Sequence, residues 1–157
     1  MENIKFRKAV IEDLETLYKF EQGIISAERP FDPTLKEGHI NYYDLKAIIQ
    51  NEDSEVFVCF HNDNIVASAS IRIKEADPFL KHEKYAFLGF MFVRNDYRGK
   101  GINKGIIEKL HAWAKDRNLN EVRLKVYQDN EPAIKAYEKA GFKRHLIEMR
   151  LDLNQVK

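Results

Sequence analysis

The sequence predicts an α/β domain built on a mixed sheet, and two adjoining stretches carry most of that prediction. Tyr85–Val93 is a long, nearly continuous apolar run, as is typical of a strand at the centre of a sheet. After a glycine-containing loop comes an amphipathic run, in which Ile102, Ile106, Leu110 and Trp113 mark one face of a helix. Strand and helix patterns then alternate to the end of the chain, as expected for this class.

The first half of the chain predicts two helices and three strands. Helices are expected from Glu12 to about Gly23 and from Tyr42 to Gln50, because apolar residues recur there at helical spacing. Between them, Ser26–Ile40 contains two prolines and a glycine and is expected to form a loop. Strands are expected at Ile4–Lys8, Glu55–Phe60 and Ile65–Ile73, with His61–Asn64 as a hairpin turn.

Three further elements are expected after the amphipathic helix. Val122–Val126 alternates as a strand, and Ala133–Ala140 has a helical apolar face with Pro132 in its first turn and Gly141 past its end. A final strand is expected over His145–Leu151, where apolar residues alternate again. The predicted order is therefore βααβββαβαβ.

Length and composition restrict the class of protein. At 157 residues the chain is expected to form one domain, residues 1–157, with 44% apolar and 32% charged residues, as in an ordinary globular protein. A net charge of +1 gives no electrostatic footprint for nucleic acid or an anionic membrane. With one cysteine, no apolar run of membrane length and no secretory signal, a cytoplasmic location is expected.

The loop before the amphipathic helix, Tyr97–Gly105, has the chemistry of an anion site. Its glycines allow positive φ, and the first-turn N–H groups of the helix point into the same loop. The spacing does not fit a P-loop, since Gly101 follows Lys100 where Ser or Thr is required. It fits a dinucleotide fingerprint poorly, because Gly101 and Gly105 are four residues apart rather than three.

Two segments resemble the signatures of the GCN5-related N-acetyltransferase (GNAT) family. Arg98–Asn103 reads Arg-x-x-Gly-x-Asn, which is similar to the acyl-CoA loop of that family. Asn130–Phe142 resembles the family's second signature: an Asn, an Ala-Ile pair, a Tyr, then Gly-Phe. The resemblance implies the GNAT fold, with a mixed central sheet of six or seven strands flanked by about four helices.

The resemblance also implies an activity and a cofactor site. The activity is transfer of an acetyl group from acetyl-CoA to an amine, by direct attack in a ternary complex and without a metal. The five histidines show no metal-ligand spacing. The implied cofactor-binding residues are Met91, Phe92, Val93, Arg98, Gly99, Lys100, Gly101, Ile102, Asn103, Asn130 and Tyr137.

Tyr137 is the implied catalytic residue, donating a proton to the departing thiolate. A phenol of pKa about 10 faces a thiol of pKa about 8.5, so close placement has to assist the transfer. The structural alternative is that Tyr137 fills the apolar face of its helix; the register with Asn130 and Gly141 favours the acid. Asn130 is also a good helix cap, and capping is compatible with a cofactor contact.

The general base is the main departure from the family. Many members carry a Glu four residues before the position of Val93, and this chain has Gly89 there. A lysine-like amine of pKa about 10.4 is almost entirely protonated at pH 7. Deprotonation is therefore expected from a water chain, from Glu28 or Asp32, or by use of an amine with a low pKa.

The segment between the first two predicted helices is expected to bind the acceptor. Charged, aromatic and proline residues concentrate there, which indicates a shaped pocket as readily as a solvated loop. The expected acceptor contacts are Glu28, Arg29, Asp32, Tyr42 and Tyr43. The acceptor itself, a small molecule or a protein amine, stays open.

Two further questions stay open in the sequence. Without a base on the central strand, a non-catalytic acyl-CoA-binding regulatory or interaction module is the alternative function, although Tyr137 favours the enzyme. The oligomeric state is also open, because an edge strand of such a sheet can pair in a homodimer. Cys59 lies in an apolar strand and is expected in the core rather than as an acyl carrier.

Overall fold

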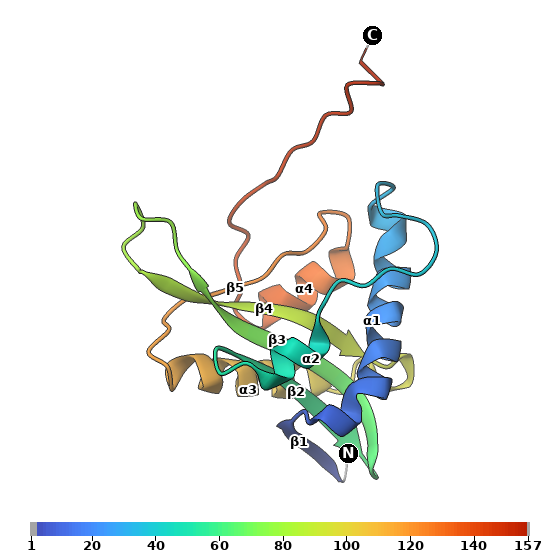
Figure 1. Ribbon diagram of the computed structural model, residues 1–157, viewed down its shortest axis with the longest axis vertical. Coiled ribbons are helices and arrows are strands. Elements are labelled where there is room, and N and C mark those ends of the chain that lie inside the picture. Colours follow the sequence, from blue (N-terminus) through green and yellow to red (C-terminus); the bar gives the residue numbers. More distant parts are fainter. Residues whose placement is uncertain (1–2, 157) are drawn as a thin grey trace.

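The computed structural model describes residues 3–156 and contains one mixed sheet (Figure 1). Its five strands lie in the order β1-β2-β3-β4-β5; all neighbours are antiparallel except β4 and β5, which are parallel. The strands are β1 (Ile4–Lys8), β2 (Ser54–His61), β3 (Asn64–Glu75), β4 (Lys84–Val93) and β5 (Val122–Arg123). The expected strands up to Val93 are confirmed.

Helices cover both faces of this sheet (Figure 1). They are α1 (Leu14–Glu28), α2 (Leu45–Gln50), α3 (Ile102–Lys115) and α4 (Glu131–Lys139), with short 3-10 helices η1 (Ile11–Asp13), η2 (Arg29–Phe31) and η3 (Asn95–Tyr97). The fold class, an α/β GNAT fold with four α-helices, is as the sequence predicts.

Alternation along β2 explains why the sheet has two cores. Phe57 and Cys59 pack on the α3 side, whereas Val56 and Val58 pack on the side of α1 and α2. Cys59 is fully buried, and burial raises the pKa of its thiol to about 11. It is therefore a core residue, because nucleophilic chemistry requires the thiolate.

The β2–β3 hairpin also follows from local sequence. Asn62 and Asp63 have φ of 47° and 66°, the left-handed region that a two-residue hairpin turn requires. His61 and Asn64 are paired at the end of the ladder. The expected turn is confirmed.

Helix α1 is longer than predicted, because Gly23 does not end it. A Cβ at Gly23 would lie 2.6 Å from Cε2 of Phe92, so the glycine allows the helix to pack closely on β4. The helix ends at Glu28, shortly before Pro30, which has no N–H to continue the helical hydrogen bonds. This extension brings Glu28 onto the helix.

Helix α2 begins three residues later than predicted, at Leu45. Asp44 is its cap and accepts a hydrogen bond from the Ala47 amide at 3.0 Å. The amides of Tyr42 and Tyr43 donate instead to the buried carboxylate of Glu21, at 3.0 and 2.9 Å. A buried acceptor on α1 therefore overrides the helical pattern of this segment.

The predicted six or seven strands are wrong, since the described sheet has five. The expected last strand, His145–Leu151, has no ladder partner and projects from the body as part of an extended segment, residues 143–156 (Figure 1). The expected strand Val122–Val126 is paired only over its first two residues. Alternation predicts extended backbone but not the strand that it pairs with.

Candidate active site

The loop between β4 and α3 has a backbone that only glycine adopts readily. Gly99 and Gly101 have φ of 72° and 79°, and Gly101 is the N-terminal cap of α3. A Cβ at either position would meet no protein atom within 4 Å. The glycines are therefore required by the backbone conformation, and the space beside them is open to a ligand.

The amides of this loop are free to bind an anion. Among the hydrogen bonds of residues 3–156, none has the N–H of Gly99, Gly101, Ile102 or Asn103 as its donor. These groups lie at the start of α3, where the helix dipole also favours negative charge. The loop therefore has free donors of the kind that the expected diphosphate cradle requires.

Two cationic side chains flank the cradle. The Arg98 Nε donates to the carbonyl of Val93 at 3.2 Å, which ties the loop to the end of β4. The Lys100 Nζ lies 5.2 Å from the centre of the Tyr97 ring. Both side chains are exposed, so their charge is available to an anion at the loop.

Strands β4 and β5 separate beside this loop. Their ladder covers only Ala86 and Phe87, so the edge of β4 that faces β5 has no strand partner beyond Phe87. A bulge in β4 near Phe90, which has φ of 49°, turns the strand further. The result is unpaired backbone next to the anion cradle, which suits the amides of an extended ligand.

The side chains at the end of β4 pack into the protein. Met91 and Val93 contact the core on the α3 side, and the Phe92 ring lies 4.5 Å from that of Phe20 on α1. Their backbone, on the unpaired edge of β4, is therefore the part best placed for the expected cofactor contact.

Helix α4 begins and ends as the sequence predicts. The Asn130 Oδ1 accepts from the Ala133 amide at 3.4 Å, and Gly141 has φ of 96° just past the helix. The capping role of Asn130 is confirmed. Its side-chain amide has hydrogens left to donate to a ligand.

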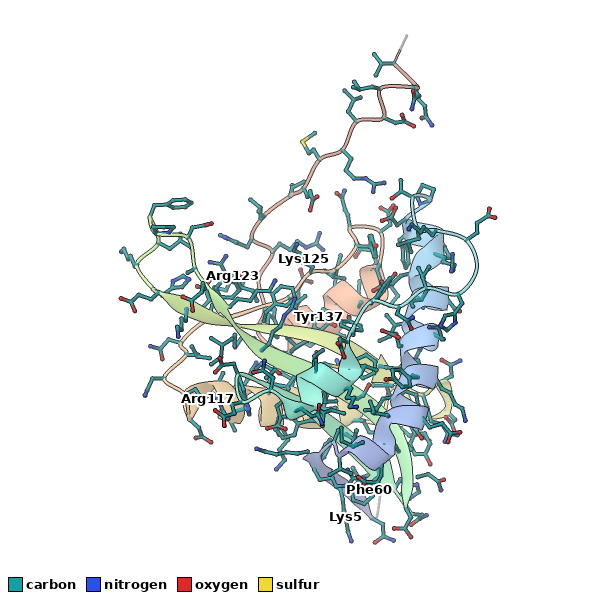
Figure 2. All side chains as sticks on the ribbon, in the orientation of Figure 1. Lys5, Phe60, Arg117, Arg123, Lys125 and Tyr137 are labelled. Atoms are coloured by element: carbon teal, nitrogen blue, oxygen red, sulfur yellow. The ribbon has the colours of Figure 1, made fainter. Side chains whose placement is uncertain are left out.

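Tyr137 lies on the side of α4 that faces the sheet (Figure 2). Its ring packs edge-on against Phe142 at 5.8 Å. Burial first, and then the neighbouring Tyr43 and Glu28, raise the pKa of the Tyr137 phenol to about 12. The hydroxyl therefore stays protonated at neutral pH, as a proton or hydrogen-bond donor must.

On the acceptor side, Tyr43 is held from both ends. Its amide donates to Glu21, and its hydroxyl accepts a hydrogen bond of 3.1 Å from the amide of Phe90 in the bulge. A Cβ at Gly89 would lie 3.8 Å from the Tyr43 hydroxyl and 3.4 Å from Oγ of Ser70. A side chain at position 89 would therefore begin in ordinary van der Waals contact with Tyr43 and Ser70.

Glu28 is placed in the same environment. Burial raises the pKa of its carboxyl above the ordinary value, and Tyr42 opposes part of that shift. The Glu28 charge also raises the pKa of Tyr42, Tyr43 and Tyr137. The structure thus brings Glu28, a residue from the end of α1, into electrostatic contact with the phenols around the site.

The Tyr42 hydroxyl lies beside the Glu28 carboxyl. The hydroxyl is buried, and no described residue meets it with ideal hydrogen-bond geometry. Burial, followed by hydrogen bonding to Glu28, nevertheless raises the pKa of the Tyr42 phenol beyond the usual range. The hydroxyl therefore stays protonated and is a donor toward Glu28.

Asp32 has the opposite electrostatic character. It accepts from the Thr34 hydroxyl and amide at 2.6 and 2.9 Å, and Tyr127 and Arg150 also donate to it, at 3.2 and 3.3 Å. These bonds, those to Thr34 above all, lower the pKa of Asp32 to about 2. Such a carboxylate is a poor proton acceptor near neutral pH.

Arg29 is placed differently from the expectation of an acceptor contact. Its guanidinium donates to the carbonyls of Lys36, at 2.6 Å, and Gly38. The side chain closes its own loop rather than facing the phenols. Arg29 is therefore a loop-positioning residue in this structure.

Glu21 and Tyr127 belong to the site although neither was predicted. Glu21 is fully buried and orients Tyr42 and Tyr43 through their amides. Tyr127 follows β5 and reaches Asp32 across 95 positions of sequence. A buried Glu within a helical apolar face was the only sequence signal for the first, and there was none for the second.

Within residues 3–156, no three His, Cys, Asp or Glu side chains gather as a metal site. In the described part of the chain, every helix is too short or too polar to span a membrane.

Comparison with known proteins agrees with this geometry. A model of the acetyltransferase (GNAT) family matches residues 13–142. Streptothricin acetyltransferase from Escherichia coli is 26% identical over 133 residues, which cover 85% of this chain and 69% of that protein.

Two solved structures have the same fold. A mutant of the BH1408 protein from Bacillus halodurans is 22% identical with a TM-score of 0.85, covering 95% of this chain and 99% of that one. A predicted acetyltransferase with acetyl-CoA from Clostridium acetobutylicum is 21% identical with a TM-score of 0.73, covering 98% of each chain.

Proposed function

Because the chain belongs to the acetyltransferase (GNAT) family, we propose that it transfers an acetyl group from acetyl-CoA to an amine by direct attack within a ternary complex. The observation that carries the proposal is the glycine loop with its four free amides, in one domain with a donor phenol and a carboxylate of raised pKa whose charge acts on that phenol. Residues 1–157 would act as one N-acetyltransferase domain.

The residues present suit acetyl-CoA as cosubstrate. The amides of Gly99, Gly101, Ile102 and Asn103 would hold its diphosphate, with Arg98 and Lys100 adding charge. The backbone of Met91–Val93 and the Asn130 side chain would hold its pantetheine arm. When bound, acetyl-CoA supplies an acetyl group activated as a thioester.

Tyr137 would donate a hydrogen bond, and then its proton, to the leaving sulfur. Because the pKa of the phenol, about 12, lies above that of a thiol, about 8.5, full transfer of the proton to the departed thiolate is uphill. The hydroxyl, already in place, would first stabilise the charge that develops on the sulfur as a hydrogen-bond donor, and its proton would follow only once the C–S bond has broken.

Glu28 would accept the proton from the attacking amine. Its pKa is raised toward the working pH, which makes it a better base than Asp32, whose pKa is about 2. The Tyr42 hydroxyl would orient the Glu28 carboxylate, since hydrogen bonding between the two affects the pKa of both groups. Glu28 thus takes the role that a residue at position 89 has in many relatives.

The acceptor would enter as a cation. The carboxylate of Glu28 and the rings of Tyr42, Tyr43 and Tyr127 form surroundings that favour an ammonium group over a neutral solute. Streptothricin acetyltransferase is named for such an amine-bearing acceptor. Either a small amine or a protein amine meets this requirement.

The test is CoA release with acetyl-CoA and a panel of amines: a polyamine, an aminoglycoside, an amino sugar, an amino acid and a lysine peptide. A thiol reagent detects the product, and the protein's own Cys59 is fully buried. We expect release above uncatalysed hydrolysis with at least one class of amine. Tight acetyl-CoA binding without release from any amine would favour the non-catalytic acyl-CoA-binding module instead.

A further inference from the structure

The segment after α4 is apolar and exposed. Every described residue from Lys143 to Val156 is exposed, including Leu146 at 86%, Ile147 at 76%, Met149 at 89%, Leu151 at 72% and Leu153 at 78%. Figure 1 shows the segment extending away from the body of the protein. So many large apolar side chains in one exposed segment mark an interaction surface.

The pattern of this segment is that of a strand with two different faces. Ile147, Met149, Leu151 and Leu153 lie on one face of an extended chain, and Glu148, Arg150 and Asp152 on the other. A turn follows, in which the Gln155 amide donates to the Asp152 carbonyl at 3.0 Å. Residues 143–153, the projecting strand, thus have the length and alternation of a half-buried β-strand.

The same molecule has an unpaired sheet edge. The edge of β5 that faces away from β4 has no partner among the described residues, and residues 124–127 have none on either side. Val122 and Leu124 pack on the core below α3, and Val126 is 38% exposed. An open sheet edge with a partly exposed row of apolar side chains favours the addition of another strand.

The two surfaces are complementary in apolar pattern, and the polar face of the projecting strand brings two carboxylates, beside Arg144 and Arg150, to a positively charged edge. A strand added to this edge would align its apolar face with Val122, Leu124 and Val126, whichever direction it runs. Glu148 and Asp152 would then lie on the same face as Arg123 and Lys125, which Figure 2 labels. Opposite charges on neighbouring strands are favourable there.

That face of the sheet has an excess of positive charge to balance. Lys125 forms no ion pair among residues 3–156, and Arg123 pairs only with Glu121 of its own segment. Burial first, and then the charges of Arg72 and Lys125, lower the pKa of Lys74 on β3, on the far side of β4 from β5. The carboxylates of Glu148 and Asp152 would offset part of this positive charge at the edge.

The projecting strand forms no ladder with its own β5 in the described structure. The Arg150 Nη1 donates to the Asp32 Oδ1 at 3.3 Å and to the Thr34 Oγ1 at 3.1 Å, so residue 150 is tied to the loop after α1. Because every copy has both an unused strand and an unused edge, a two-fold arrangement satisfies both at once. A second copy of the chain is also always available as a partner, because the strand and the edge belong to the same protein and occur at equal concentration.

We propose that two copies of this chain exchange their C-terminal segments: residues 143–153 of each copy add as a strand beside residues 122–127 of the other. Each sheet then gains a sixth strand, supplied by the partner. The apolar row of the projecting strand becomes buried, and Glu148 and Asp152 meet Arg123 and Lys125 across the new ladder.

The first test is the mass of the full chain in solution, by sedimentation equilibrium. We expect a dimer, twice 18.5 kDa, and a monomer for the double variant Met149→Asp, Leu151→Asp. The matched control is Val10→Asp, Ile11→Asp, which places the same charges on exposed apolar residues after β1, at the far edge of the sheet. The control should stay dimeric. A monomeric wild-type chain, or a tail variant that remains dimeric, would overturn the proposal.

The second test separates exchange from folding back. Lys125→Cys and Glu148→Cys are combined in one chain and treated with a short bis-maleimide, while the native Cys59 is buried and unreactive. Exchange predicts covalent dimers, and neither single variant should yield them in comparable amount. A cross-linked monomer of unchanged mass would show that the strand returns to its own β5, which contradicts exchange.

Discussion

The proposed cofactor side and the proposed acceptor side of this site use different parts of the polypeptide. The cofactor side consists of backbone: the free amides of residues 99–103 and the unpaired edge of β4. The acceptor side consists of side chains from distant segments, such as Tyr127 bonded to Asp32 across 95 positions. Backbone cradles depend on a short run of permissive residues, whereas a side-chain pocket depends on how the whole chain packs.

The difference also appears in the electrostatics. The cradle concentrates partial positive charge from amides, with Arg98 and Lys100 exposed beside it. The acceptor side concentrates phenols and the half-buried carboxylate of Glu28, and burial raises the pKa values of these groups. One half is prepared for an anion and the other for a cation, as a reaction between acetyl-CoA and an amine requires.

The largest expected effect is on the cofactor side, with Gly101→Glu. This change adds a negative charge to the cradle and a side chain where φ is 79°. At 100 times its dissociation constant, acetyl-CoA should stabilise the wild-type chain by about 2.7 kcal/mol, seen as a raised melting temperature. The variant should show no such shift.

Gly38→Glu is the matched control for that experiment. Gly38 also has positive φ, at 77°, and open space beside it, but it lies on the loop after α1. It should keep the acetyl-CoA shift despite the same strain and charge. An equal loss of the shift in both variants would mean that the cradle has no special role.

Tyr137→Phe tests the residue that lies between the two sides. Removing the hydroxyl removes the proton donor but keeps the ring that packs against Phe142. General acid catalysis contributes roughly 100- to 10,000-fold, so kcat should fall within that range while acetyl-CoA affinity is retained. A rate within about twofold of wild type, with chemistry rate-limiting, would leave Tyr137 as a packing residue.

The smallest effect is expected on the acceptor side, from Asp32→Asn. Because the pKa of Asp32 is lowered to about 2, the residue does not serve as base, and kcat/KM should change by less than about threefold. The lowered pKa predicts a stabilising contribution that is present above about pH 4 and lost as the pH falls toward 2. Acid unfolding followed by circular dichroism should therefore shift to higher pH in the variant. A large loss of activity at neutral pH would transfer the role of base to Asp32.

Sequence reasoning predicted the local conformation of the proposed cofactor side, because its rules are local. The glycine conformations at 99 and 101, the cap at Asn130 and the end of α4 at Gly141 each depend on a few adjacent residues. The central strand was predicted for the same reason, since an apolar run needs no knowledge of its partners.

The acceptor side and the strand count were not accessible in that way. Gly23 reads as a helix end, yet its lack of a side chain serves contact with Phe92, which is 69 positions away. Tyr42 and Tyr43 read as helix, yet a buried Glu21 accepts their amides. The alternating apolar residues of His145–Leu151 predict extended backbone, but they do not predict which strand this segment pairs with.

The central claim is that Glu28, at the end of α1, replaces the base that Gly89 cannot supply. The most direct test is the pH profile of kcat/KM for wild type and Glu28→Gln, with the thermal stability of both measured in the same buffers. The raised pKa means that the ionised carboxyl destabilises the fold above its ordinary pKa. We therefore expect Glu28→Gln to lose about 100-fold or more in kcat/KM, to lose the acidic limb of the profile, and to melt at a higher temperature at neutral pH. An unchanged profile with unchanged activity would contradict the account.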